Sequence, residues 1–76
     1  MNETPEIVTI DTEEIQLDQF LKWAGATASG GEVKALIAEG LVYRNGEKES
    51  ARRRRLHDGD VITVKGLGSY QVKVKG

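Results

Sequence analysis

The stretch from Ser29 to Gly46 limits the folds open to this chain more than any other part of it. Ser29 can cap a helix N-terminus, and Glu32 can reach back to the backbone N–H of the cap residue. Apolar residues then recur with the spacing of one helix face and end at a glycine, which can adopt the left-handed conformation that stops a helix. These residues are Val33, Leu36, Ile37 and Gly40. The pattern predicts a short helix with Leu36 at the centre of its core-facing side.

A strand and a tight turn are predicted directly after this helix. Leu41–Arg44 is too short for a second helix and contains Val and Tyr, which fit a pleated surface. Asn45-Gly46 favours a type I′ turn, because both central positions of that turn need a positive φ. Helix, stop, strand and hairpin turn therefore follow one another without a linker.

The N-terminal part predicts a strand and a second helix. Leu17–Ala24 places Leu17, Phe20, Leu21 and Ala24 on one face, and Gly25 ends the helix. The link to the Ser29 helix is brief, so the two helices should pack as an angled pair. Before them we expect a loose end over residues 1–6, a strand over Ile7–Ile10, and a turn or helix approach over Asp11–Gln16.

The C-terminal part predicts further strands. Glu47–Ser50 is a weak strand or loop, His57–Asp60 a turn, Val61–Lys65 a strand, Gly66–Gly68 a loop and Tyr70–Val74 a last strand. Together these elements predict a single α+β domain over residues 1–76, in which a helix pair packs on a small, mostly antiparallel sheet.

Charge is distributed unevenly along the chain. The formal net charge is only −1, with 11 Lys and Arg against 12 Asp and Glu. Up to Ala26, six acids stand against Lys22 alone, whereas Arg44–Arg55 is strongly basic. Such a dipolar chain can present one basic face to a polyanion despite its net charge. The absence of cysteine, of a signal-peptide pattern and of a long apolar run favours a cytoplasmic protein.

Two features of the sequence could bind an anion, and each also has a purely structural interpretation. The run Arg52, Arg53, Arg54 and Arg55 either grips phosphates through planar guanidinium groups or is a solvated loop. The Ser29-Gly30-Gly31 turn either presents backbone N–H groups to an anion at a helix N-terminus or only caps the helix. Lys22 and Lys34 lie off the apolar helix faces and are candidate RNA contacts or simply solvated.

Other candidate groups give little support for catalysis. Trp23 lies beside the apolar stripe, where half-buried packing competes with base stacking, and Tyr43 has the same two interpretations. His57 is the only histidine and has no cysteine nearby, which argues against a metal site or Ser–His chemistry. No paired carboxylates with a matching base are evident. We therefore expect no enzyme activity, no cofactor, no metal and no small-molecule substrate.

The order and spacing of several motifs resemble the S-four RNA-binding domain. The matching residues run from about Gln16 to Val64: Leu17-Asp18, Phe20-Leu21, Ser29, Lys34, Gly40, Val42, Asn45-Gly46, Gly59-Asp60 and Ile62. Leu21-Lys22, Ser29-Gly30-Gly31, Arg52-Arg53 and Gly68–Val72 are more similar still to short free-standing bacterial members, the YaaA/YbcJ-like group.

The resemblance implies a two-helix αL motif and hairpin that bind structured RNA, such as ribosomal or transfer RNA, in association with the ribosome. By position it implies RNA contacts from Lys22, Ser29, Gly30, Gly31, Lys34 and Arg44, with Arg52–Arg55 as an accompanying basic cluster. Gln16 and Gly30 stand where many members have arginine, and Arg44 replaces a common apolar residue. The alternative is an adaptor whose acidic N-terminal half binds a basic, for example ribosomal, protein.

Overall fold

The computed structural model describes residues 4–75, and its elements follow the order ββααβββββ. The helices are α1 (Leu17–Trp23) and α2 (Gly30–Ala38). The strands are β1 (Glu6–Ile10), β2 (Glu14–Gln16), β3 (Val42–Arg44), β4 (Glu47–Lys48), β5 (Arg55–His57), β6 (Val61–Val64) and β7 (Gly68–Val74).

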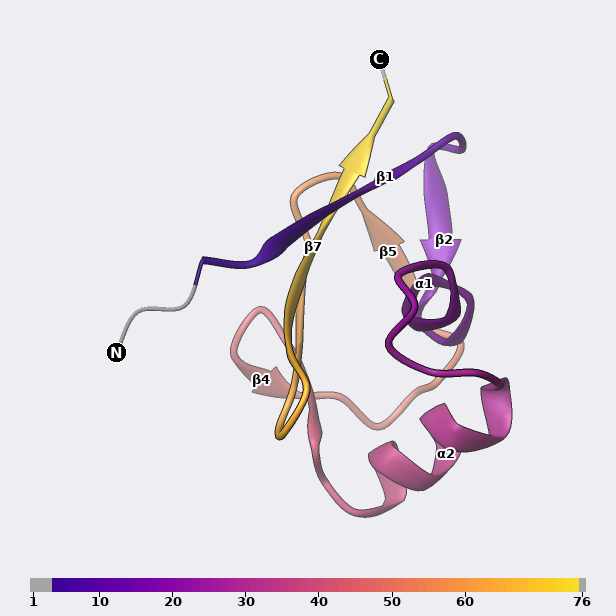
Figure 1. The fold of residues 1–76 in the computed structure, drawn as a ribbon, viewed down its shortest axis with the longest axis vertical. Helices are drawn as coiled ribbons and strands as arrows, with labels where there is room; N and C mark the ends of the chain where they lie inside the picture. Colours follow the sequence, from indigo (N-terminus) through magenta and orange to yellow (C-terminus); the bar gives the residue numbers. More distant parts are fainter. Residues whose placement is uncertain (1–3, 76) are drawn as a thin grey trace.

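Five strands form one sheet in the order β1-β7-β6-β3-β4. The pairing of β1 with β7 is parallel and brings the first and last strands together, while the other three pairings are antiparallel. Both helices lie on the same side of this sheet (Figure 1). The α+β class and the mostly antiparallel sheet are therefore confirmed.

A second, two-stranded sheet was not predicted. Strand β2 pairs antiparallel with β5, with Ile15 opposite Leu56, although Asp11–Gln16 was expected to be a turn or helix approach and Arg55 to lie in a loop. Each strand has only three residues, too few to show an alternation in the sequence, and each exists because the other lies beside it. The expected loose end at residues 1–6 is also wrong at Glu6, which begins β1, and residues 1–3 lie outside the described part.

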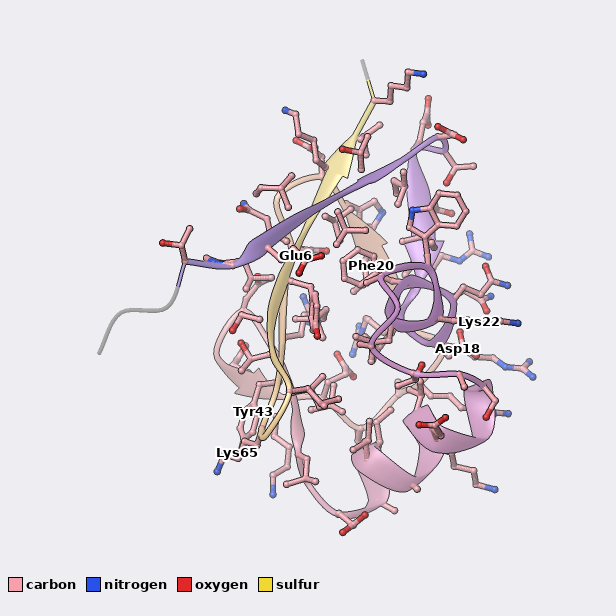
Figure 2. The ribbon with its side chains drawn as sticks, in the orientation of Figure 1. Glu6, Asp18, Phe20, Lys22, Tyr43 and Lys65 are labelled. Carbon is pink, nitrogen blue, oxygen red and sulfur yellow. The ribbon has the colours of Figure 1, made fainter. Side chains whose placement is uncertain are left out.

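The core lies between the helix pair and the sheet. Phe20 points from α1 toward the sheet and is fully buried (Figure 2). The predicted α1 stripe is confirmed, with Leu17 and Leu21 also fully buried. On α2 the fully buried residue is Val33, whereas Leu36 is only partly buried against the core. The predicted face is therefore the one that packs on the core, but Leu36 is not its most buried residue, because burial is complete only at Val33, nearer the start of the helix.

The helix ends and the hairpin turn form largely as the residue types dictate. Gly40 has φ +72°, and Asn45 and Gly46 have φ 51° and 87°, as a type I′ turn requires. At the start of α2 the Ser29 Oγ accepts from the Glu32 N–H at 3.4 Å. The Glu32 carboxylate, however, accepts from the Ala28 N–H at 3.0 Å, one residue before the predicted partner. The cap is therefore a variant of the expected capping box.

Candidate nucleic-acid interface

The loop that carries the arginines is attached to α1 through its backbone. The Arg54 carbonyl accepts from the Leu17 N–H at 2.8 Å, and the Arg52 carbonyl accepts from the Asp18 N–H at 2.9 Å. The N-cap residue Gln16 makes no side-chain cap, so the loop satisfies N–H groups that a capping side chain would otherwise serve. This attachment fixes the backbone of the loop next to the helix pair.

Arg52 brings the loop, α1 and the first turn of α2 together. A Cβ placed on Gly30 would lie 3.8 Å from Arg52 Nη1 and 3.8 Å from Asp18 Oδ2. The Arg52 guanidinium therefore lies beside the glycine turn at the N-terminus of α2. Positive charge and backbone N–H donors at a helix start both favour an anion.

Arg44 and Arg54 are both engaged by one buried carboxylate. Glu49 is only 4% exposed, and its Oε1 accepts from Arg44 Nε at 2.9 Å and from Arg54 Nε at 3.0 Å. Its Oε2 accepts from the backbone N–H groups of Ser50 at 3.1 Å and Ala51 at 3.0 Å. Glu49 thus ties the β3 end to the arginine loop, and its single negative charge offsets part of the positive charge of the two arginines.

The environment of Glu49 favours its ionised form. Burial by itself raises the pKa of the Glu49 carboxyl, but the hydrogen bonds from Ala51, Arg44 and Arg54 outweigh it and hold that pKa below its usual value. A lowered pKa in the folded state contributes stability above the unfolded pKa of about 4.3 that is lost as pH falls through the folded value.

We expect Glu49→Gln to lower the free energy of unfolding at neutral pH by about 1–3 kcal/mol, because charge-assisted hydrogen bonds are lost. The variant should also lose less stability between about pH 5 and pH 3 than the original chain. Urea denaturation at several pH values measures both effects. Glu39→Gln, at an exposed position, is the matched control. Parallel pH profiles for the original chain and Glu49→Gln would contradict the assigned role.

The remaining arginines differ in their partners. Arg55 Nη1 lies 2.6 Å from Glu14 Oε1, and the other oxygen of Glu14 lies 3.1 Å from His57 Nε2. Arg52 and Arg53 make no ion pair with any residue between 4 and 75. The run of four is thus divided into Arg54 and Arg55, which form ion pairs with carboxylates, and Arg52 and Arg53, which form none among the described residues.

The predicted lysines lie on the outer surface of the helix pair. Lys22 is exposed in the last turn of α1 and points away from the sheet, as does Asp18 (Figure 2). Lys34 is exposed on α2. Neither lysine forms a salt bridge within the described residues. Of the other predicted positions, Ser29 caps α2, Gly30 contacts the arginine loop, and Gly31 is exposed.

Tyr43 lies apart from this surface. The Lys65 Nζ lies 5.3 Å from the centroid of the Tyr43 ring, and both side chains extend on the side of the molecule away from α1 (Figure 2). This arrangement is a cation–π contact.

Sequence reasoning missed Glu49 and Asp18 as parts of the site. Glu49 resembles any surface acid in a polar stretch, and only its burial at 4% exposure shows its role. Asp18 was noted as part of the Leu-Asp motif, but its approach to Gly30 depends on how the two helices pack.

Two further searches gave negative results. Within residues 4–75, no group of three or more His, Cys, Asp or Glu side chains has the arrangement of a metal site. In the same part of the chain, every helix is too short or too polar to cross a membrane.

Comparison with known proteins gives a consistent family assignment. The model of the S4 domain matches residues 8–73. A protein of Bacillus subtilis named "Probable ribosome maturation protein RlbA" is 46% identical over 65 residues, which is 86% of this chain and 92% of that protein. An "Uncharacterized RNA pseudouridine synthase" of Aquifex aeolicus is 41% identical over 55 residues, 72% of this chain but only 17% of that enzyme.

The match to the family model covers nearly all of the described chain, from β1 into β7. It includes the helix pair, the hairpin and the arginine loop whose geometry is given above. The relative from Bacillus subtilis is matched over almost its whole length, so the similarity is not confined to one motif. The chain belongs to the S4 domain family, the RNA-binding family that its sequence resembles.

Proposed function

We propose that this protein binds structured RNA without catalysing a reaction, and that its target is ribosomal RNA during ribosome assembly in the cytoplasm. The observation that carries the proposal is the Arg52 guanidinium beside Gly30, where the fixed loop meets the first turn of α2. The name of the relative from Bacillus subtilis supports ribosomal RNA as the target class, ahead of transfer RNA. The pseudouridine synthase is matched over 17% of its length, so its activity gives no support for catalysis here.

The candidate residues differ in their proposed roles: some contact RNA and others hold the loop in place. Arg52 and Arg53 meet phosphates directly, since neither forms an ion pair among residues 4–75, although the Asp18 carboxylate lies on the same side of Gly30 as Arg52. Lys22, Lys34 and the backbone of Gly30-Gly31 extend this surface across the helix pair. Arg44 and Arg54 hold the loop in place through Glu49. Arg55 is exposed but forms an ion pair with Glu14, so we expect it to contribute less to RNA affinity.

Structured RNA fits this arrangement better than an unstructured strand. The cations and the glycine turn lie at fixed positions on two helices and an anchored loop, which suits phosphates in a fixed array. RNA duplexes and junctions present such arrays and are recognised mainly by shape and backbone. Proteins that hold single strands instead use several aromatic platforms in a row. Here Phe20 is buried and Tyr43 lies away from α1, so no such row exists among the described residues.

We expect a hairpin or junction RNA to outcompete an unstructured RNA of equal length and similar composition. The measurement is a competition assay with labelled junction RNA at near-physiological salt, because salt concentration controls any phosphate-based affinity. A DNA hairpin of the same sequence serves as a control for simple charge attraction. Equal competition by the unstructured strand would rule out recognition by shape. Binding that required the acidic N-terminal residues and a basic protein would instead favour the adaptor.

A further inference from the structure

Trp23 is held in an exposed position by a hydrogen bond. Its Nε1–H donates to the Thr9 carbonyl at 3.0 Å, so the indole is tied by its polar edge to β1. The side chain is nevertheless 61% exposed, more than the half-buried packing that the sequence favoured. A large aromatic ring that is fixed and yet open to solvent is suited to bind a planar partner.

Two adjoining hollows open beside this ring. One has a volume of about 290 Å³ and is lined by Ile10, Asp11, Thr12, Glu14, Ile15, Gln19 and Trp23. The other, of about 490 Å³, is lined by Ile15, Gln19, Lys22 and Trp23 and shares three of these residues with the first. Trp23 and Ile15 supply apolar surface, and Gln19 supplies both an amide donor and an acceptor. The two hollows therefore combine apolar side chains with polar ones, including the Gln19 amide and the Asp11 and Glu14 carboxylates, a mixture that suits a planar ligand with polar edges.

The ring adjoins the proposed RNA surface. Lys22 precedes Trp23 on α1, points away from the sheet and lines the second hollow (Figure 2). Trp23 lies six positions after Leu17, where the arginine loop is attached, which is roughly 9 Å along the helix axis. A nucleotide next to phosphates held at Lys22 can thus reach the indole.

We propose that Trp23 is a stacking platform for one unpaired base that projects from the bound RNA, with Gln19 at the edge of that base and Lys22 on an adjoining phosphate. The proposal rests on the RNA-binding function proposed above and makes it more specific: the target is a helical or junction RNA with an extruded nucleotide. A single platform accommodates one base without a row of rings.

The carboxylates of the first hollow raise the other possibility, a cationic side chain of a protein stacked on the indole. Both oxygens of Glu14 already have partners, Arg55 and His57, and this weakens the attraction of Glu14 for a further cation. Asp11 lines only the first hollow, whereas Lys22 lines the second. Continuity with the arginine loop along α1 therefore favours the base.

The test uses the fact that Trp23 is the only tryptophan of the chain. Its fluorescence is measured during titration with a junction RNA carrying one extruded adenosine, and with the same RNA carrying an abasic nucleotide there. Stacking predicts quenching by the first RNA and little change with the second. Affinities for both RNAs are measured in parallel by anisotropy of a label on the RNA. The adenosine RNA should bind roughly five- to 150-fold more tightly, the range for stacking one base.

Two variants separate stacking from structural support. Trp23→Leu should abolish the preference for the adenosine RNA while binding the abasic RNA as before, and Trp23→Tyr should restore part of it. A thermal melt of each variant is the control for correct folding. Unchanged discrimination in Trp23→Leu, or equal fluorescence with both RNAs, would overturn the stacking role while leaving RNA binding intact. Quenching by an arginine-rich peptide but not by RNA would assign Trp23 to a protein partner, and absence of any RNA binding would refute the proposed function as well.

Discussion

Replacing Phe20 with alanine should lower the free energy of unfolding by about 3–5 kcal/mol. The ring is fully buried between α1 and the sheet, so its removal loses apolar burial and leaves a cavity that the neighbouring strands cannot fill (Figure 2). A domain of this size has roughly 5 kcal/mol of stability in total. The variant should therefore be largely unfolded near 37 °C. Urea denaturation followed by circular dichroism measures the change.

Gln19→Ala is the matched control for this prediction, because Gln19 is exposed on the same helix. It should change the free energy of unfolding by less than about 0.5 kcal/mol. A loss below about 1 kcal/mol in Phe20→Ala would contradict the packing of α1 on the sheet. Leu36→Ala should cost less than Phe20→Ala, since Leu36 is only partly buried.

Changing Arg52 and Arg53 together to serine should weaken binding to a junction RNA by about thirtyfold at 0.15 M salt. The figure follows from the loss of two phosphate contacts, each releasing close to one counterion. The thermal melting temperature should change little, because neither side chain makes an ion pair among residues 4–75. RNA binding is measured by anisotropy and stability by a thermal melt.

Arg54→Ser is the control, and we expect it to affect stability more than RNA affinity. Arg54 donates to the buried Glu49, so this change should lower stability more than the Arg52 and Arg53 changes do. Its effect on RNA affinity should be smaller than that of the double variant in conditions where it is folded. A similar loss of affinity from Arg54→Ser would show that the four arginines act alike, as their shared place in the sequence suggested.

The sequence was most informative where structure is decided locally. The Ser29 cap, the Gly40 stop and the Asn45-Gly46 turn each depend on backbone preferences of adjacent residues, and all three form, although Glu32 binds the Ala28 N–H and not that of Ser29 as predicted. Strand β2 was missed because its partner β5 lies far away in the sequence. Leu36 shows the same limit on a smaller scale, since how deeply each residue of α2 is buried depends on how the helix packs against the rest of the molecule.

The residues of the candidate site could be predicted from the sequence, but their separate roles could not. The basic run and the glycine turn were evident from the order of residues in the sequence, and their binding to RNA stays a prediction. The pairing of Arg44 and Arg54 with Glu49 depends on which carboxylate becomes buried, and no local pattern reveals that. The exposure of Trp23 likewise depends on the hydrogen bond to Thr9, which comes from a different element.

The dependence of RNA affinity on salt concentration tests the central claim most directly. For the unmodified chain and one junction RNA, log K plotted against log salt should fall with a slope of roughly −3 to −4, as expected for about four phosphate contacts, from Arg52, Arg53, Lys22 and Lys34. The Arg52→Ser, Arg53→Ser double variant should show a slope smaller in magnitude by about 2. An identical slope in the two proteins would contradict phosphate contacts by Arg52 and Arg53, and would remove the arginine loop from the RNA interface.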